Sequence, residues 1–126
     1  MIDHLTLRVA DYARSKRFYE AALLPLGYAK IMEVEGFCGL GVGGKPDFWL
    51  ARSEEGPRPP VHIAFAAKSR KDVDRFYQAA LEAGAKDNGK PGLRKEYHPN
   101  YYGAFVLDPD GHNIEACCIK PEEAKG

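Results

Sequence analysis

Three residues of the sequence carry side chains that bind divalent metals in proteins: His4, His62 and Glu115. Neutral imidazole nitrogens together with a carboxylate suit Zn, Mn, Fe or Ni. Three protein ligands leave coordination positions open for water or substrate, which is typical of a catalytic site. The alternative is that each histidine is an ordinary core or surface residue. The prediction therefore depends on whether the fold brings the three side chains together.

Alternation of apolar residues in three expected strands places these side chains on the less apolar faces. An expected strand at 5–9 has its apolar residues on one face, and His4 lies on the other. A strand at 61–67 repeats this pattern with His62, and Glu115 lies opposite the apolar face of a third strand near the C-terminus. A buried carboxylate without a partner is very costly, so Glu115 is expected to have one.

A repeat within the chain relates the two histidines to each other. The motif Arg-Phe-Tyr at 17–19 recurs at 75–77, and His4 recurs as His62, both 58 positions later. Self-similarity over half a chain indicates a duplicated supersecondary unit. Each copy predicts one strand, one helix and about three further strands. The same duplication matches Trp49 to Glu115, so no second acid occupies the equivalent place.

The expected fold is therefore α+β, with two paired βαβββ modules in a single domain over residues 1–126. Module one spans 1–56, module two spans 57–120, and a polar tail covers 121–126. The linker between the modules is expected at three prolines: Pro57, Pro59 and Pro60. A single ferredoxin-like sandwich is the competing fold.

Capping and terminating residues give the limits of the two expected helices. Asp11 and Ser69 are the predicted N-caps. Pro25 and Gly27 are predicted to end the first helix, and Gly84 the second.

Composition excludes several classes of partner. The chain has 18 basic and 18 acidic residues among its 126, so its net charge is zero and gives no support for a nucleic-acid or membrane-surface partner. Its apolar runs are too short to span a bilayer, and its N-terminus carries charges where a signal peptide would have its apolar core. The three cysteines make a poor disulfide framework. A cytoplasmic location with reduced thiols is expected.

The segment 87–104 has no clear periodicity and is expected to form a long loop that determines substrate specificity. Aromatic and basic side chains over the mouth of a cup suit an anionic or oxygen-rich small molecule. His98 is a candidate general acid or base. The alternative is a solvated hairpin loop with surface tyrosines. The loop's candidate residues are Arg94, Lys95, Tyr97, His98, Tyr101 and Tyr102.

Four stretches of the chain resemble the vicinal oxygen chelate superfamily: DHLTLRVAD, RFYEAALLPLGY, VHIAFAA and YGAFVLDPDGHNIEA. This superfamily includes glyoxalases, fosfomycin-resistance enzymes, extradiol dioxygenases and bleomycin-binding proteins, and the resemblance covers roughly residues 1–119. It implies paired βαβββ modules that form an open cup, usually in a homodimer. It also implies that His4, His62 and Glu115 are the metal positions.

The resemblance further implies a set of residues around the metal. In the fosfomycin-resistance branch, the residues matching Thr6 and Trp49 belong to the substrate pocket, and Phe105 stands where those enzymes carry a tyrosine. Thr6 is therefore a candidate catalytic residue, together with His98 of the 87–104 segment. The candidate substrate-binding residues are Trp49, Arg94, Lys95, Tyr97, Tyr101 and Phe105.

The expected function is that of a glyoxalase-like enzyme with redox-neutral lyase, isomerase or transferase chemistry. One divalent ion (Zn, Mn, Ni or Fe) would hold two oxygens of a small substrate. The alternatives are a metal-free binder that sequesters a small molecule, as in bleomycin resistance, and an extradiol-type dioxygenase. Cys117 shares a strand face with Glu115 and would be an oxidation liability in an oxygen-activating site. The sequence leaves open whether the ligands come from one chain or across a dimer interface.

Overall fold

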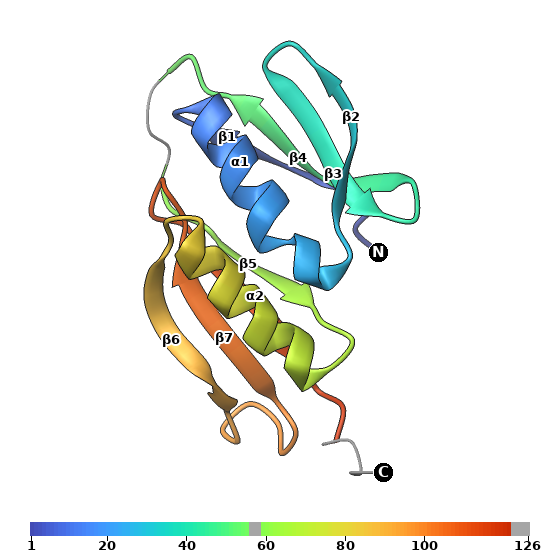
Figure 1. Ribbon diagram of the computed structural model, residues 1–126, viewed down its shortest axis with the longest axis vertical. Helices are drawn as coiled ribbons and strands as arrows, with labels where there is room; N and C mark the ends of the chain where they lie inside the picture. The colour runs from blue at the N-terminus through green and yellow to red at the C-terminus, as the bar shows by residue number, and fades with distance from the viewer. Residues whose placement is uncertain (56–58, 122–126) are drawn as a thin grey trace.

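The computed structural model describes residues 1–55 and 59–121, and it contains two copies of one βαβββ unit (Figure 1). The first copy comprises β1 (Leu5–Val9), α1 (Tyr12–Ala22), a short 3-10 helix η1 (Leu24–Leu26), β2 (Ala29–Val34), β3 (Phe37–Val42) and β4 (Lys45–Arg52). The second comprises β5 (His62–Ala66), α2 (Arg70–Glu82), β6 (Lys86–Leu93), β7 (Tyr102–Leu107) and β8 (Asn113–Cys118). The two predicted modules are confirmed. Of the predicted linker and tail, Pro57 and residues 122–126 lie outside the described residues.

The strands form two separate four-stranded sheets, in the orders β1-β4-β3-β2 and β5-β8-β7-β6. Both sheets stay open, so the single ferredoxin-like sandwich is wrong. Helices α1 and α2 lie side by side, each over its own sheet (Figure 1). The edge strands β1 and β5 lie next to each other, since Leu5 and Ile63 line one hollow. The sheet faces away from the helices therefore form two open surfaces.

Strand register confirms the duplication residue by residue. In module one, Thr6 of β1 pairs with Trp49 of β4 in a parallel ladder. In module two, Ala64 of β5 pairs with Glu115 of β8 in the same way. Thr6 and Ala64 are themselves 58 positions apart, so Trp49 and Glu115 are structural equivalents, as the repeat predicts.

The helix starts agree with the predicted caps, and one helix end differs. Asp11 accepts a hydrogen bond from the Arg14 amide, and Ser69 accepts one from the Asp72 amide, both at 3.1 Å. Helix α1 ends at Ala22, and the predicted terminators lie in and after η1. Pro25 cannot donate the next helical hydrogen bond, so the chain tightens into a 3-10 turn there.

Part of the predicted specificity loop is a strand. Residues 86–93 form β6, an edge strand that pairs with β7, which leaves 94–101 as the connection between them. Register shifts interrupt the ladder on both sides of Gly89. Pro91 is tolerated because an edge strand does not need every amide to pair. Bulges and glycines removed the alternation by which a strand is recognised in a sequence.

The acidic turn at 108–111 connects the two modules. Asp108 organises the turn by accepting hydrogen bonds from the amides of Asp110 and His112 at 2.9 and 2.8 Å, and the Tyr19 hydroxyl of α1 donates to its other oxygen. The Asp110 carboxylate accepts from the Ala10 amide at 3.0 Å. The aspartates of this turn therefore bind module one and do not belong to the candidate site.

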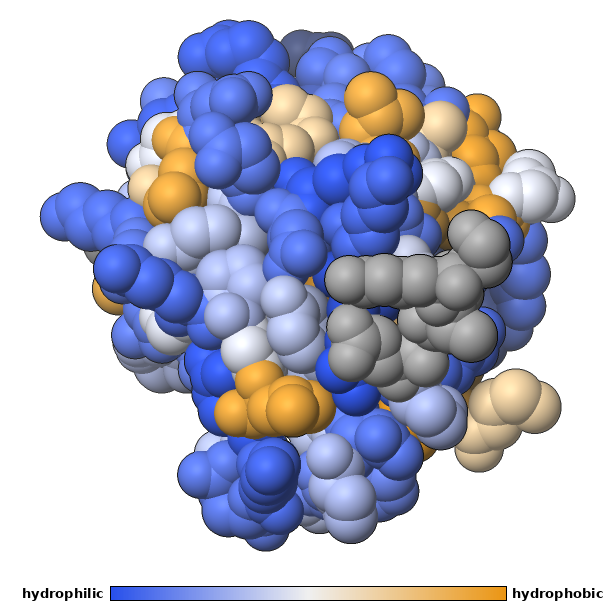
Figure 2. Space-filling view, turned by 60° about the horizontal axis from the view of Figure 1, so that its bottom comes forward, coloured by the Kyte–Doolittle hydropathy of each residue, from blue (hydrophilic) through white to orange (hydrophobic). Residues whose placement is uncertain are grey.

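A cluster of aromatic rings continues the core from one module to the other. Phe65 of β5 contacts Phe48 and Tyr28 of module one edge to face, with ring centroids 5.2 and 5.4 Å apart. On the outside, hydrophobic residues lie in separate small patches among hydrophilic ones on the face in Figure 2. No helix among the described residues is long and apolar enough to cross a membrane.

Candidate functional site

Two of the three predicted metal ligands meet on the open face of the second sheet. His62 Nε2 lies 2.8 Å from Glu115 Oε1, across the adjacent strands β5 and β8. The Glu115 side chain is 2% exposed, whereas the His62 side chain is 53% exposed. The buried carboxylate of the last strand therefore has the partner that its burial demands.

The second oxygen of Glu115 has a different partner. The hydroxyl of Tyr101, the last residue of the 94–101 connection, donates a hydrogen bond to Glu115 Oε2. Burial and this bond raise the pKa of Tyr101, so the hydroxyl stays protonated as a donor. Cys117 lies two residues along the same strand face, and burial raises the pKa of its thiol. Imidazole, carboxylate and phenol thus form one connected chain of hydrogen bonds.

A glycine allows the approach of Tyr101 to Glu115. A Cβ at Gly103 of β7 would lie 3.2 Å from the Tyr101 ring and 3.4 Å from Glu115 Oε2. Tyr101 is among the predicted substrate-binding residues, but its bond to Glu115 was not predicted. The sequence feature that could have indicated this bond is the glycine two residues after Tyr101, on the strand next to the one that carries Glu115.

The rim of this site carries one cation beside an aromatic ring. The Phe105 ring lies 6.1 Å from the His62 ring, and the Arg94 guanidinium lies 5.4 Å from the Phe105 centroid. Arg94 also donates to the Lys90 carbonyl at 2.7 Å, which fixes its position. The remaining hydrogen-bond donors of the guanidinium are free for an anionic group, since Arg94 forms no ion pair with the described residues.

The other predicted residues of the connecting loop are more exposed. His98 Nδ1 accepts a hydrogen bond from the Asn100 amide at 3.0 Å. Tyr97 packs edge-on against the Tyr101 ring, with centroids 5.2 Å apart, and Lys95 is exposed. These side chains lie on the loop that carries Tyr101, so the loop is joined to the site through that residue.

The third predicted ligand lies on the open face of the first sheet. His4, Thr6 and Trp49 line a hollow of about 450 Å³ there. His4 is 55% exposed and its Nδ1 lies 2.8 Å from the Asp3 carboxylate. Trp49 stacks on Phe37, with an interplanar angle of 15°.

Within one chain, His4 does not join the His62–Glu115 pair. Among the described residues, no three His, Cys, Asp or Glu side chains lie close enough together to hold a metal ion. The two halves of the predicted site instead lie on two different open sheet faces of the same molecule.

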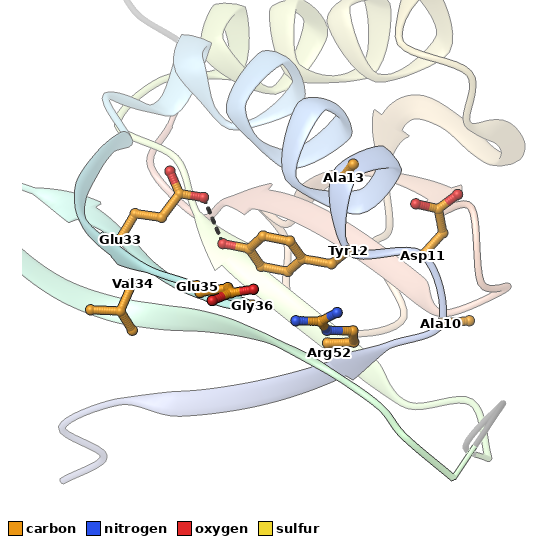
Figure 3. A pocket seen from close by; sticks show the side chains of 9 residues that line it. All are labelled: Ala10, Asp11, Tyr12, Ala13, Glu33, Val34, Glu35, Gly36 and Arg52. Atoms are coloured by element: carbon orange, nitrogen blue, oxygen red, sulfur yellow. Dashed lines mark hydrogen bonds between the residues drawn. The ribbon is translucent and has the colours of Figure 1, made fainter.

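A larger hollow, of about 800 Å³, lies away from all of these residues, between the start of α1 and the turn from β2 to β3 (Figure 3). Tyr12 crosses it and donates to Glu33 at 2.8 Å. Lys16 and Lys30 neutralise the same carboxylate. It contains none of the predicted site residues.

Comparison with known proteins identifies the family. A family model described as Glyoxalase/Bleomycin resistance protein/Dioxygenase superfamily matches residues 1–116. The chain belongs to this superfamily. The resemblance inferred from the sequence motifs is therefore confirmed, as is the fold that it implied. No curated protein sequence matches the chain.

Solved structures of the superfamily share the fold along nearly the whole chain. A glyoxalase/bleomycin resistance protein from Albidiferax ferrireducens T118 is 27% identical, with a TM-score of 0.79 over 94% of this chain and 98% of that one. A glyoxalase/bleomycin resistance protein/dioxygenase family enzyme from Burkholderia phytofirmans PsJN is 18% identical, with a TM-score of 0.71 over 94% and 98%. A glyoxalase-related enzyme from Fulvimarina pelagi is 17% identical, with a TM-score of 0.73 over 100% and 94%. The last two likenesses concern the fold alone.

Proposed function

We propose that this superfamily member is a metal-dependent, glyoxalase-like enzyme that acts without redox chemistry on a small, oxygen-rich substrate. His62 and Glu115 hold the metal, and His4 of a second copy of the chain completes the site. The observation that carries the proposal is the 2.8 Å contact between His62 Nε2 and the buried Glu115 carboxylate.

The donor atoms of this pair fit a divalent ion. An imidazole nitrogen and a carboxylate oxygen are the ligands that Zn, Mn, Fe and Ni share. They point at each other from adjacent strands of a rigid sheet, and the histidine side is open to the solvent. Such an ion supplies Lewis-acid stabilisation of charge that develops on substrate oxygens.

The proposal includes a second copy of the chain because the third ligand, His4, lies on the open face of the first sheet, whereas His62 and Glu115 lie on the second sheet. His4 and Trp49 are accessible beside a hollow, and no described donor of their own chain completes a three-ligand group with His4. In a two-fold symmetric dimer, the first sheet of each chain would cover the second sheet of the other, which produces two identical sites.

The surrounding side chains would bind and orient the substrate. Arg94, held over Phe105, would anchor an anionic group, and Trp49 would form the apolar wall. Thr6 would donate a hydrogen bond from the partner's face. His98, on the loop that carries Tyr101, would transfer protons.

Cys117 favours redox-neutral chemistry over oxygen activation. Its thiol lies on the strand face of Glu115, two residues further along β8, so reactive oxygen species formed at the ion would oxidise it.

A metal-free binder is the second candidate. It is favoured by the same pair, because His62 and Glu115 satisfy each other's hydrogen bonds without an ion. The aromatic side chains on both open faces, Trp49 and Phe105, would then sequester an apolar ligand.

Metal analysis of the purified protein and three variants separates these candidates. Wild type and His98→Ala should retain about one divalent ion per chain, whereas Glu115→Gln and His62→Ala should lose it. His98→Ala is the matched control, because it removes an imidazole that is not a proposed ligand. Equal metal content in all four proteins would refute the proposed site. Ligand-induced thermal shifts would then test the binder.

A further inference from the structure

The two carboxylate oxygens of Glu115 contact two different residues. Oε1 faces His62 Nε2 at 2.8 Å, while Oε2 accepts the hydrogen bond of Tyr101. The carboxylate is buried, so water does not compete for either oxygen. An ion that approached from the His62 side would therefore find one oxygen available and the other engaged.

We propose that Tyr101 is a positioning residue that keeps Oε2 of Glu115 out of the coordination of the metal. Glu115 then binds through Oε1 alone. This inference rests on the proposed metal site, and it adds a residue that is not itself a ligand. Hydrogen bonds from such neighbours are known to orient metal-binding carboxylates.

The Tyr101 hydroxyl has a single proton, and it donates that proton to Glu115. The backbone of Tyr101 is held as well, because its carbonyl accepts from the Arg94 amide at 2.7 Å and its amide donates to the His98 carbonyl at 3.0 Å. The tyrosine is thus placed before any ion binds.

Single-oxygen binding matters because it determines how many coordination positions remain. In an octahedral ion such as Mn²⁺, two histidines and a carboxylate bound through one oxygen leave about three positions for water, and a carboxylate bound through both oxygens leaves about two. A substrate that chelates through two oxygens needs two of these positions. Tyr101 therefore preserves one position beyond the chelated substrate.

Water proton relaxation of the Mn²⁺-loaded protein counts the exchangeable waters on the ion and tests the inference. Tyr101→Phe removes only the hydroxyl, so Glu115 should bind through both oxygens and displace one water, which lowers the inner-sphere relaxation by about a third. Tyr102→Phe is the matched control. It is the same substitution one residue later, and it removes a hydroxyl that bonds Asp74 at 2.6 Å outside the site. It should leave the relaxation unchanged.

The outcomes separate this inference from the proposed function. A wild type that binds none of Zn²⁺, Mn²⁺, Fe²⁺ and Ni²⁺ would overturn both. Equal numbers of waters in Mn²⁺-loaded wild type and Tyr101→Phe would overturn the role of Tyr101 alone. If Tyr101→Phe does not fold, NMR of the Zn²⁺-loaded wild type decides. The Tyr101 hydroxyl proton should persist as a slowly exchanging resonance, and its disappearance on adding Zn²⁺ would contradict the inference.

Discussion

At the scale of single residues, two carboxylates of this chain are each held by several donors for different purposes. Glu115 is buried and shared between His62 and Tyr101, so its geometry is fixed toward an open face. Glu33 lies exposed and accepts from Lys16, Lys30 and Tyr12. The first arrangement holds a buried carboxylate beside a histidine, and the second ties α1 to β2.

The Glu33 arrangement predicts a pH dependence of stability. The bond from Lys16, followed by those from Lys30 and Tyr12, lowers the pKa of Glu33 from 4.5 to about 2. Because the folded pKa lies below the unfolded value, the stabilisation is complete above about pH 4.5 and is lost as the pH falls towards 2. Glu33→Gln should therefore cost a small amount of stability at neutral pH, and the difference should shrink below pH 4.5. Urea unfolding over a pH series would measure it, and a difference independent of pH would contradict it.

At the scale of elements, the alternation of apolar and polar residues predicted strands such as β5 and β8. It did not predict β6, whose sequence does not alternate. The alternation of apolar residues placed His62 and Glu115 on the face away from the helices, and their strands β5 and β8 pair accordingly. The glycines, proline and bulges of β6 removed that signal from residues 87–93. The bond from Tyr101 to Glu115 was also not predictable, since it depends on the path of a loop and not on alternation.

The turn between β3 and β4 offers a prediction about close packing. A Cβ at Gly41 would lie 1.9 Å from the Lys45 carbonyl oxygen, a backbone atom that cannot move aside. Gly41→Ala should therefore lower the free energy of unfolding by about 3 kcal/mol or more. Gly43→Ala is the control, because its added Cβ meets nothing within 4 Å and only its positive φ of 70° opposes it, at about 1 kcal/mol. Urea denaturation compares the two, and equal costs would refute the steric explanation.

At the scale of the whole molecule, two features join the modules: a shared core of aromatic rings and the contact of the acidic turn with α1. Phe65 inserts between Phe48 and Tyr28 of the other module, and Asp110 binds the start of α1. The internal repeat predicted two modules, and it could not predict how they lie against each other. Among the described residues, that arrangement does not bring His4 into one ligand group with His62 and Glu115.

Truncation of Phe65 should test whether the shared core holds the modules together. The side chain is 6% exposed, and Phe65→Ala should cost about 3–5 kcal/mol while unfolding remains a single transition. Phe65→Leu, which keeps most of the buried volume, should cost clearly less. Circular dichroism and fluorescence followed during urea unfolding would measure both, and a cost below about 1 kcal/mol for the alanine variant would contradict a coupled core.

The central claim is that a metal site forms from His62 and Glu115 of one chain and His4 of another. Two differently tagged chains, one carrying His4→Ala and one carrying Glu115→Gln, can be co-expressed and purified through both tags. Each variant alone should bind no metal. The mixed dimer should retain about half of the wild-type metal content, because one of its two symmetric sites then has every ligand intact. A mixed dimer without metal, or a failure of the two chains to associate, would contradict the account.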